Sequence, residues 1–314
     1  MIDVLTFGEA MVSLRADQPI RAGGVLRMSV AGAETNVAIG LARLGHLVRW
    51  VGLTGDDEFG GLVLRTLRAE GVDTDMAERT EGPTGLVAFE PRIAEVTRVS
   101  YYRSGSAGSS IGPQHVAPAL QQLPRIVHAT GITAALGSTP LEAVRTAVRR
   151  AKSAGVTVSF DVNHRSKLWS RDGAAAALRP LMPHVDILIA SDDELALAAP
   201  AGAVTEAEQV EALLVSGVRE VVVKRGAHGA EVFDASGSTA RPAVPVTVRD
   251  TVGAGDAFVA GYLSGLLDGE TVERRLERAG TVGAFAVTST GDWEGLPERN
   301  ELDLIRATPG SAIR

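Results

Sequence analysis

Residues 250–258 read DTVGAGDAF, and a short run of strand-forming residues at 246–248 precedes them. We predict that the chain leaves a strand, turns through the glycines and enters a helix over about residues 255–267. Three backbone amides would be unpaired at the N-terminus of that helix, those of Gly253, Ala254 and Gly255. Such a helix end carries partial positive charge and binds anions. Asp256 lies in the first turn, where its carboxylate would project beside the anion.

A carboxylate beside an anion site suits phosphoryl transfer. The amides would hold the charge that develops on the transferred group, and Asp256 would accept the proton of the attacking hydroxyl. An unperturbed Asp pKa of about 3.9 would leave this base ionised at neutral pH. In the structural alternative, Asp256 only caps the helix and the glycines only make a turn. The motif taken alone does not decide between the two.

Strand-like apolar runs alternate with helix-like segments through most of the chain. For example, the run at 126–130 precedes a helical pattern at 140–153, and another apolar run follows at 157–161. This order predicts an α/β fold with a doubly wound, mainly parallel sheet flanked by helices. In such sheets, ligands bind beyond the carboxyl ends of the strands.

Two stretches, 10–31 and 84–103, break that alternation because they have strand character without a helix. We predict that they form a small separate β-sheet that acts as a lid. The remaining ranges, 1–9, 32–83 and 104–314, would form the α/β domain that binds nucleotide and substrate. Edge strands of a lid pair readily with a second copy, so we expect a homo-oligomer, a dimer or larger.

Composition narrows the class of protein. The chain has 314 residues, a formal net charge of −7, no cysteine and 45% hydrophobic residues. A sizeable core can form, whereas disulfides, thiolate metal sites and a broad basic face for nucleic acid are excluded. No apolar run approaches the roughly 20 residues that span a bilayer. The N-terminus lacks the basic region of a signal peptide, so we expect a cytoplasmic protein with no membrane partner.

Three missing patterns exclude further classes. The sequence lacks the Gly-x-x-x-x-Gly-Lys-Ser/Thr pattern of P-loop kinases. It also lacks a Gly-x-Gly-x-x-Gly after the first strand, which disfavours a nicotinamide-dependent dehydrogenase. The six histidines show no ligand spacing, so we expect no histidine-based zinc site.

A second motif, AGAETNVA at residues 31–38, leads from small residues into a predicted helix. Gly32 would let a substrate approach the backbone, and Asn36 could hydrogen-bond a sugar hydroxyl. An ordinary helix start is the alternative. Together, this motif and the one at 250–258, about 220 residues further on, resemble the two signatures of the ribokinase-like (PfkB) family of carbohydrate kinases.

The resemblance extends over nearly the whole chain. It implies an enzyme that uses ATP with Mg²⁺ to phosphorylate a hydroxyl of a sugar or nucleoside, on an α/β domain with a β lid. It also allows a monovalent cation near Asp250. The alternative is a non-catalytic sugar-binding protein of the same fold, which the intact Asp256 and its glycine loop disfavour.

Three further segments resemble those of the 2-keto-3-deoxygluconate kinases within that family: YYRSGSA at 101–107, DVNHR at 161–165, and GD at 291–292. In those enzymes the sugar acid is contacted by the residues that match Gly32, Tyr101, Arg103, Arg165, Asp256 and Asp292. A substrate carboxylate needs a planar cationic fork, which Arg supplies and Lys does not. The resemblance therefore implies phosphorylation of the terminal primary hydroxyl of 2-keto-3-deoxygluconate to give its 6-phosphate.

Two positions bear on the identity of the sugar. Ser13 stands where kinases of neutral sugars commonly carry an Asp that binds sugar hydroxyls, so its identity favours an acidic substrate. Val87 stands where the keto-acid kinases carry a Tyr, and Val cannot donate a hydrogen bond. A different sugar acid, or a neutral sugar such as fructose or ribose, is therefore an open alternative.

The nucleotide side has two candidate segments. Residues 191–194, SDDE, match the family's Asn-x-x-Glu segment, which is linked there to Mg²⁺ and phosphate. Ser191 replaces the Asn, whereas Glu194 is retained and would help to place Mg²⁺. The alternative is an acidic helix start that complements the helix dipole.

Residues 224–230, KRGAHGA, match a family loop that lies against the nucleotide. Lys224 or Arg225 would meet phosphates, while Gly226 and Gly229 give the backbone freedom. A basic turn without a ligand is the alternative. The small residues at 279–286 could leave room for an adenine ring, and they could equally serve close packing between helices.

Overall fold

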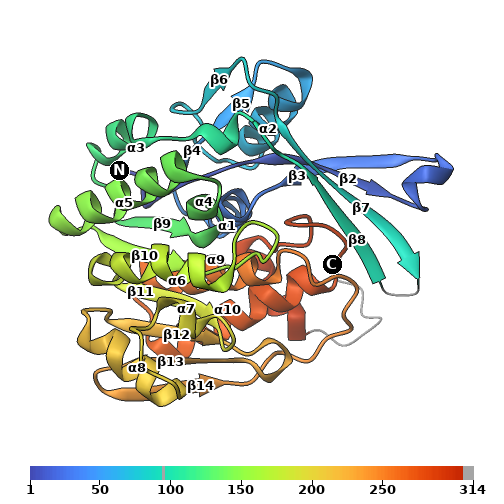
Figure 1. Cartoon of the computed structure of the whole chain (residues 1–314). Helices are drawn as coiled ribbons and strands as arrows, with labels where there is room; N and C mark the ends of the chain where they lie inside the picture. Colours follow the sequence, from blue (N-terminus) through green and yellow to red (C-terminus); the bar gives the residue numbers. More distant parts are fainter. Residues whose placement is uncertain (94–95, 307–314) are drawn as a thin grey trace.

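The computed structural model describes residues 1–93 and 96–306, and an eight-stranded sheet runs through its centre (Figure 1). The strands are, in spatial order, β14 (Gly237–Arg241), β13 (Ala230–Asp234), β12 (Glu220–Lys224), β11 (Ile187–Ser191), β10 (Thr157–Asp161), β9 (Ile126–Thr130), β1 (Val4–Phe7) and β4 (Val48–Val51). The strands from β12 to β4 are parallel, and β13 and β14 add an antiparallel edge.

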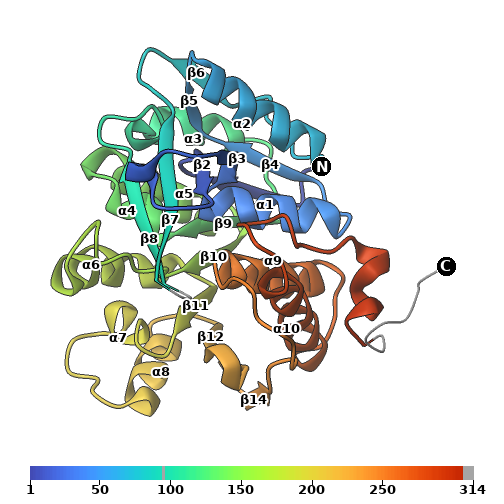
Figure 2. The same ribbon diagram turned by 90° about the vertical axis from the view of Figure 1, so that its right-hand side faces the viewer.

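Helices cover both faces of this sheet (Figures 1 and 2). One face carries α1 (Ala33–Arg43), α2 (Glu58–Ala69), α9 (Ala254–Leu267) and α10 (Val272–Val287). The other carries α3 (Pro113–Leu120), α4 (Gly131–Ala135), α5 (Ser138–Ser153), α6 (Arg171–Leu178), α7 (Leu195–Ala198) and α8 (Glu206–Val215). Successive connections therefore place helices on both sides, as a doubly wound sheet requires.

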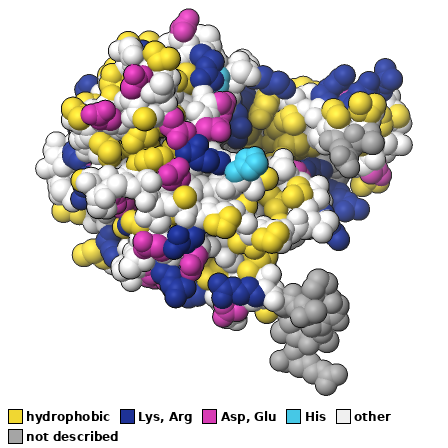
Figure 3. Space-filling model, turned by 90° about the horizontal axis from the view of Figure 1, so that it is seen from below, with side chains coloured by type: hydrophobic (Ala, Val, Ile, Leu, Met, Phe, Trp, Pro, Cys, Tyr) yellow, Lys and Arg dark blue, Asp and Glu magenta, His cyan; other side chains and the backbone are white. Residues whose placement is uncertain are grey.

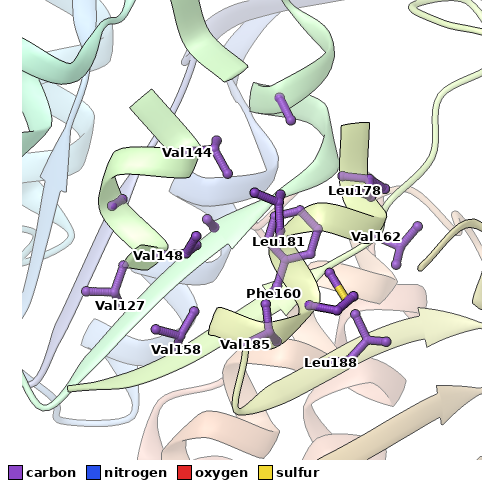
Figure 4. Close-up of a cluster of buried hydrophobic side chains, with 14 of the residues drawn as sticks. Val127, Val144, Val148, Val158, Phe160, Val162, Leu178, Leu181, Val185 and Leu188 are labelled. Atoms are coloured by element: carbon purple, nitrogen blue, oxygen red, sulfur yellow. The ribbon is translucent and has the colours of Figure 1, made fainter. Parts of the chain in front are cut away.

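The central strands contribute side chains to two separate hydrophobic cores, one on each face of the sheet. In β12, Val221 and Val223 belong to one core and Val222 to the other, and all three side chains are fully buried. Figure 4 shows part of the first core, including Phe160 of β10 and Val148 of α5. Strands buried on both faces read as continuous apolar runs, which is why the sequence pattern identified them.

A separate four-stranded sheet projects from this body (Figure 1). Its spatial order is β3 (Leu26–Ala31), β2 (Met11–Ala16), β7 (Gly85–Ile93) and β8 (Val96–Tyr102). The pair β2 and β7 is parallel, and the outer pairs are antiparallel. A two-stranded sheet of β5 (Leu53–Gly55) and β6 (Glu78–Thr80) lies beside α2 (Figure 1).

The strand predicted at 246–248 is wrong, because residues 242–250 form no strand. Pro242 and Pro245 have no backbone N–H to donate to a neighbouring strand, which prevents pairing here. The segment instead runs as irregular backbone toward α9, whose first residue is Ala254.

The charged side chains on the surface are of both signs, as the composition predicts. On the face shown in Figure 3, basic and acidic side chains are interspersed without a broad area of one sign. Among the described residues, no helix has both the length and the apolar character that a membrane crossing demands.

Candidate active site

A cavity of about 450 Å³ lies between the four-stranded sheet and the carboxyl ends of β10, β11 and β12. This edge of the parallel strands is where the fold pattern predicts a ligand. The cavity wall includes every substrate-contacting residue that the sequence predicts, namely Gly32, Asn36, Tyr101, Arg103, Arg165, Asp256 and Asp292. Residues from five separate stretches of the chain therefore meet around one space.

The carboxylate of Asp256 lies in the first turn of α9 and is held by two amides. Asn36 Nδ2 donates to Oδ2 at 2.8 Å, and Asn163 Nδ2 donates to Oδ1 at 3.3 Å. The side chain is mostly buried, with 6% of the residue exposed, but it still lines the cavity. Its orientation therefore leaves it within reach of a bound ligand.

Burial raises the pKa of Asp256 to about 6. The hydrogen bond from Asn36 and the positive charge of Arg165 oppose that rise, while the nearby Asp161 adds to it. The ordinary value expected from the sequence is therefore wrong, because sequence does not reveal desolvation. A base with a pKa just below neutrality is well matched to proton abstraction near pH 7.

The N-terminus of α9 begins at a left-handed glycine. Gly253 has φ 75°, and a Cβ there would lie 1.9 Å from the backbone oxygen of Asp292, so only glycine fits. The amide of Ala254 donates to Thr251 O at 3.3 Å, which corrects the prediction that all three amides are unpaired. Those of Gly253 and Gly255 have no acceptor in the described part of the chain.

Gly32 and Asn36 differ in part from their predicted use. A Cβ on Gly32 would lie 2.6 Å from the backbone oxygen of Glu9, so close backbone packing already requires glycine here, and Gly32 also lines the cavity, where its role in substrate approach stays a prediction. The amide nitrogen of Asn36 donates to Asp256, whereas the buried Oδ1 of Asn36 has no hydrogen-bond partner among the described residues. That oxygen is the atom available to accept a hydrogen bond from a ligand hydroxyl.

The two arginines are held differently. Arg103 forms an ion pair with the fully buried carboxylate of Glu9, and its guanidinium carbon lies 5.6 Å from the centre of the Tyr101 ring. Arg165 is exposed and has no ion pair within the described ranges. Part of the charge of Arg103 is therefore already neutralised, while Arg165 offers its full charge to a ligand.

The inner face of the four-stranded sheet is mainly apolar where it meets the cavity. Met11, Val87 and Phe89 form its wall together with Ala31. Ser13 is paired with Val87 across β2 and β7 and is fully buried, so it does not line the cavity itself. Neither position presents a carboxylate or a hydroxyl donor to a sugar.

Asp292 lies in the cavity wall together with Asp256, and burial raises its pKa to about 7. Arg15 of β2 contacts Asp292 Oδ2 at 3.3 Å and Asp250 Oδ2 at 2.8 Å. A monovalent cation near Asp250 would meet this guanidinium, which already places a positive charge there. The residues present do not fit such a cation.

Glu194 and Ser191 lie at the end of β11. The carboxylate of Glu194 accepts from His164 N at 2.6 Å and from Ser191 N at 3.0 Å, which leaves one lone pair free on each oxygen. The described residues include no group of three or more side chains that could enclose a metal ion. A single carboxylate at the cavity wall fits Mg²⁺, which keeps waters and takes most of its other ligands from phosphates.

A second cavity of about 480 Å³ adjoins the first and is largely apolar. Lys224, Thr251 and Gly255 line both cavities. The glycines of the loop after β12 and three small residues of α10 form much of its wall: Gly226, Gly229, Gly280, Gly283 and Ala284. Lys224 Nζ is held by both carboxylate oxygens of Asp161, at 2.9 and 2.8 Å, so it stands at the junction of the two spaces.

Four residues around the site were not singled out from the sequence: Glu9, Arg15, Asn163 and Asp161. Asn163 has a left-handed backbone, with φ 38°, which aims its side chain at Asp256. Asp161 and Asn163 fall inside the segment DVNHR, so a search for partners within that segment could have found them. Nothing in the sequence around Glu9 or Arg15 signals their contacts.

Comparison with known proteins identifies the family. The model for the pfkB family of carbohydrate kinases matches residues 1–299. The chain belongs to this family. Its predicted ribokinase-like fold is confirmed, because a structure described as a ribokinase II from E. coli, in complex with ATP and Mg²⁺, superposes with a TM-score of 0.90. The sequence identity of that pair is 27%, and the match covers 98% of this chain and 99% of the other.

Curated relatives refine the likeness. The chain is 37% identical to a 2-dehydro-3-deoxygluconokinase from Thermoproteus tenax, over 98% of this chain and 95% of the relative. It is 32% identical to a 2-dehydro-3-deoxygalactonokinase from Haloferax volcanii, over 92% of both. This pfkB-family protein is therefore a carbohydrate kinase with relatives that act on keto sugar acids.

Proposed function

We propose that this kinase transfers the γ-phosphoryl group of ATP to the terminal primary hydroxyl of a sugar acid. The substrate we favour is 2-keto-3-deoxygluconate, and the product would be its 6-phosphate. The supporting observation is that Asp256, Arg103 and Arg165 line one cavity. A base and two planar cations around one small space suit a ligand with a hydroxyl at one end and a carboxylate at the other.

The chemistry assigns one task to each group. Asp256 accepts the proton of the attacking hydroxyl as the hydroxyl oxygen bonds to the γ-phosphorus. The bond from that phosphorus to the bridging oxygen breaks, and ADP leaves with the electron pair. The free amides of Gly253 and Gly255 hold the negative charge on the transferred phosphoryl oxygens. Lys224, between the two cavities, faces the phosphate chain.

The ATP base would occupy the apolar cavity beside α10, and its phosphates would extend past Lys224. Glu194 would hold Mg²⁺ through its remaining lone pairs or through water. When bound, Mg²⁺ offsets phosphate charge and orients the phosphate chain. The residues of the four-stranded sheet would act as a lid, because its apolar wall excludes water that could otherwise hydrolyse ATP.

The arginines set the substrate class. Arg165 brings an uncompensated charge, and Arg103 adds donors that its ion pair with Glu9 holds in place. With Ser13 buried and Val87 apolar, the sheet offers no carboxylate to the hydroxyls of a neutral sugar. Asn36 Oδ1, Asp292 and the hydroxyl of Tyr101 would bind the sugar hydroxyls.

We also propose a cytoplasmic homo-oligomer. ATP is supplied inside the cell, and β3 and β8 are the unpaired edges of the four-stranded sheet. Met28 and Tyr102 on these edges are exposed, at 61% and 65%, which favours pairing with a second copy. Light scattering after size exclusion measures the assembly, and a monomeric mass at micromolar concentration would contradict it.

A substrate panel tests the reaction. An assay of ADP release is run with 2-keto-3-deoxygluconate, 2-keto-3-deoxygalactonate, gluconate, fructose and ribose, and with no sugar. We expect the highest kcat/KM with 2-keto-3-deoxygluconate, and phosphorus NMR should show a primary phosphate ester. Preference for the galacto epimer would change only the named sugar, as the Haloferax volcanii relative suggests.

Two outcomes would overturn the proposal. A higher kcat/KM with fructose or ribose would show that the arginines do not select a carboxylate. ADP release that is independent of every sugar, or no ADP release and calorimetric binding of sugar alone, would favour a non-catalytic binding protein of the same fold.

A further inference from the structure

Arg15 belongs to the four-stranded sheet but makes its polar contacts with the α/β body. It lies in β2 two positions beyond Ser13, on the same face as Met11. Its Nη1 atom contacts Asp250 Oδ2 at 2.8 Å, and its Nη2 atom contacts Asp292 Oδ2 at 3.3 Å. One guanidinium therefore bridges two carboxylates that are 42 positions apart in the chain.

The two carboxylates belong to loops that are already joined. Asp250 Oδ1 accepts from Val252 N at 3.1 Å, and Asp250 Oδ2 accepts from Gly291 N at 3.3 Å. Gly253 lies directly against the backbone of Asp292. Residues 250–253 and 291–292 thus form one unit at the mouth of α9, and Arg15 is its link to the sheet.

The surroundings of Arg15 restrict its movement. Its guanidinium carbon lies 4.2 Å from the centre of the Phe89 ring, on the neighbouring strand β7. Its side chain is only 18% exposed. A planar cation that is stacked on a ring and bonded to two carboxylates is held more firmly than an exposed surface pair, so this contact can transmit position.

The charges around Asp292 make Arg15 the main counterion of the unit. Asp256 and Glu294 both face Asp292 and repel its ionised form, and Asp250 adds a third acidic group. Arg15 opposes them, and without it the loops would carry clustered negative charge where the phosphate chain must enter. Relaxation of the loop would then move the amides of Gly253 and Gly255.

We propose that Arg15 is a positioning residue that ties the four-stranded sheet to residues 250–253 and 291–292, and so holds the anion-binding amides of α9 in place when the sheet covers the cavity. It contacts neither substrate nor nucleotide in this assignment. Only the kinetic arm of its test rests on the proposed function.

The test compares three variants in the full chain. Arg15→Gln removes the charge and the fork, Arg15→Lys keeps the charge alone, and Arg27→Gln is the matched control. Arg27 stands opposite Arg15 in the ladder of β2 and β3, is exposed, and forms none of the ion pairs among the described residues. Circular dichroism and thermal unfolding establish that each variant folds.

Hydrogen–deuterium exchange is the arm that needs no activity. We expect faster exchange in Arg15→Gln at two peptides, one covering 250–256 and one covering 11–16, with an intermediate effect in Arg15→Lys. Arg27→Gln should match the wild type at 250–256. Unchanged exchange of that peptide in Arg15→Gln would overturn the proposal.

The kinetic arm separates positioning from general damage. We expect Arg15→Gln to lower kcat by about tenfold to a hundredfold, since a small misplacement of reacting groups costs that much. KM for ATP should change less than threefold, and Arg15→Lys should recover part of kcat. A loss confined to KM, or an equal loss in Arg27→Gln, would contradict the proposal. If the wild type phosphorylates no sugar acid, the proposed function fails, and the exchange arm still decides the role of Arg15.

Discussion

Asn36 and Asp256 are 220 residues apart in the chain, yet Asn36 Nδ2 donates a 2.8 Å hydrogen bond to Asp256 Oδ2. This contact joins the two motifs on which the family assignment depends. A hydrogen bond donated to a carboxylate favours its ionised form, so Asn36 offsets part of the burial that raises the pKa of Asp256. The carboxylate that we propose as the base is thereby kept largely ionised at neutral pH.

The first prediction concerns the pH dependence of the wild type. Asp256 must be ionised to accept a proton, so kcat/KM should rise with pH through the pKa of this carboxyl, which burial raises to about 6. Asp292 faces the same cavity, and burial raises its pKa to about 7, so the apparent pKa values of the profile belong to the pair of carboxyls. A profile that is flat from pH 5 to pH 8 would contradict the assignment.

Replacing Asn36 should shift the acid limb of this profile, which is the part where kcat/KM rises with pH. In Asn36→Leu the carboxylate of Asp256 loses its shorter hydrogen bond, so the pKa rises and the limb shifts upward by roughly one pH unit. Asn163→Gly is the matched control, because it keeps the left-handed backbone and removes only the longer bond of 3.3 Å. A downward shift in Asn36→Leu, or a larger upward shift in Asn163→Gly, would count against the role of Asn36.

Removing the base itself should abolish most of the activity. Asp256→Asn preserves shape but cannot accept the proton, so we expect kcat to fall by about 10²–10⁴. ATP binding measured by calorimetry should stay within threefold of the wild type, which separates lost chemistry from lost structure. Full activity in this variant would show that another group takes the proton.

Much of the fold was predictable because its strands are buried on both faces. β12 has three valines in succession, β9 and β10 are interrupted at their centres only by the buried side chains of His128 and Ser159, and the helices between them have clear helical periods. Strands β13 and β14 were not predicted, since AEVFD and GSTAR contain too few apolar residues in sequence to stand out. They form because β13 can hydrogen-bond to the free edge of β12, and β14 to β13. That edge exists only in the folded protein, so the local sequence does not reveal it.

The site was predictable only where residues sit in contiguous motifs. Asp256 and Gly253 could be found because glycines and a carboxylate at a helix start have a recognisable spacing. Arg15 could not, because one arginine on an alternating strand has the pattern of an ordinary surface residue. Glu9 likewise has no local pattern, and its ion pair with Arg103 appears only when β8 is packed against the body.

The ion pair between Glu9 and Arg103 leads to a prediction about two quantities, the stability of the protein and its KM for the sugar acid, that can be measured separately. Arg103→Gln leaves the buried carboxylate of Glu9 without its partner, so we expect the free energy of unfolding to drop by about 3–5 kcal/mol. KM for the sugar acid should also rise by about tenfold to a hundredfold, with KM for ATP changed far less. Denaturant unfolding and steady-state kinetics measure the two effects.

A double variant distinguishes the two roles of Arg103. Arg103→Gln combined with Glu9→Gln removes both charges, so stability should recover substantially while KM for the sugar acid stays high. Lys167→Gln is the control for loss of a nearby positive charge, since Lys167 is exposed, donates to Val99 O and, like Arg103, lies 5.6 Å from the centre of the Tyr101 ring. Recovery of KM together with stability would mean that Arg103 acts only through the fold.

The last prediction tests the nucleotide cavity through Gly280 of α10, which lines it. A Cβ at this position would have ordinary contact with Val244, at 3.9 Å, so Gly280→Ala should fit and stabilise the helix by about 0.5–1 kcal/mol. Gly280→Leu would extend into the space we assign to adenine. We expect it to raise KM for ATP by at least tenfold, roughly the cost of losing a ring's apolar contacts, while KM for the sugar acid stays near the wild-type value. Equal effects on the two KM values, or no effect on KM for ATP, would place the adenine elsewhere. The two cavities share only residues around Lys224 and the start of α9, so a change at Gly280 should affect one of them.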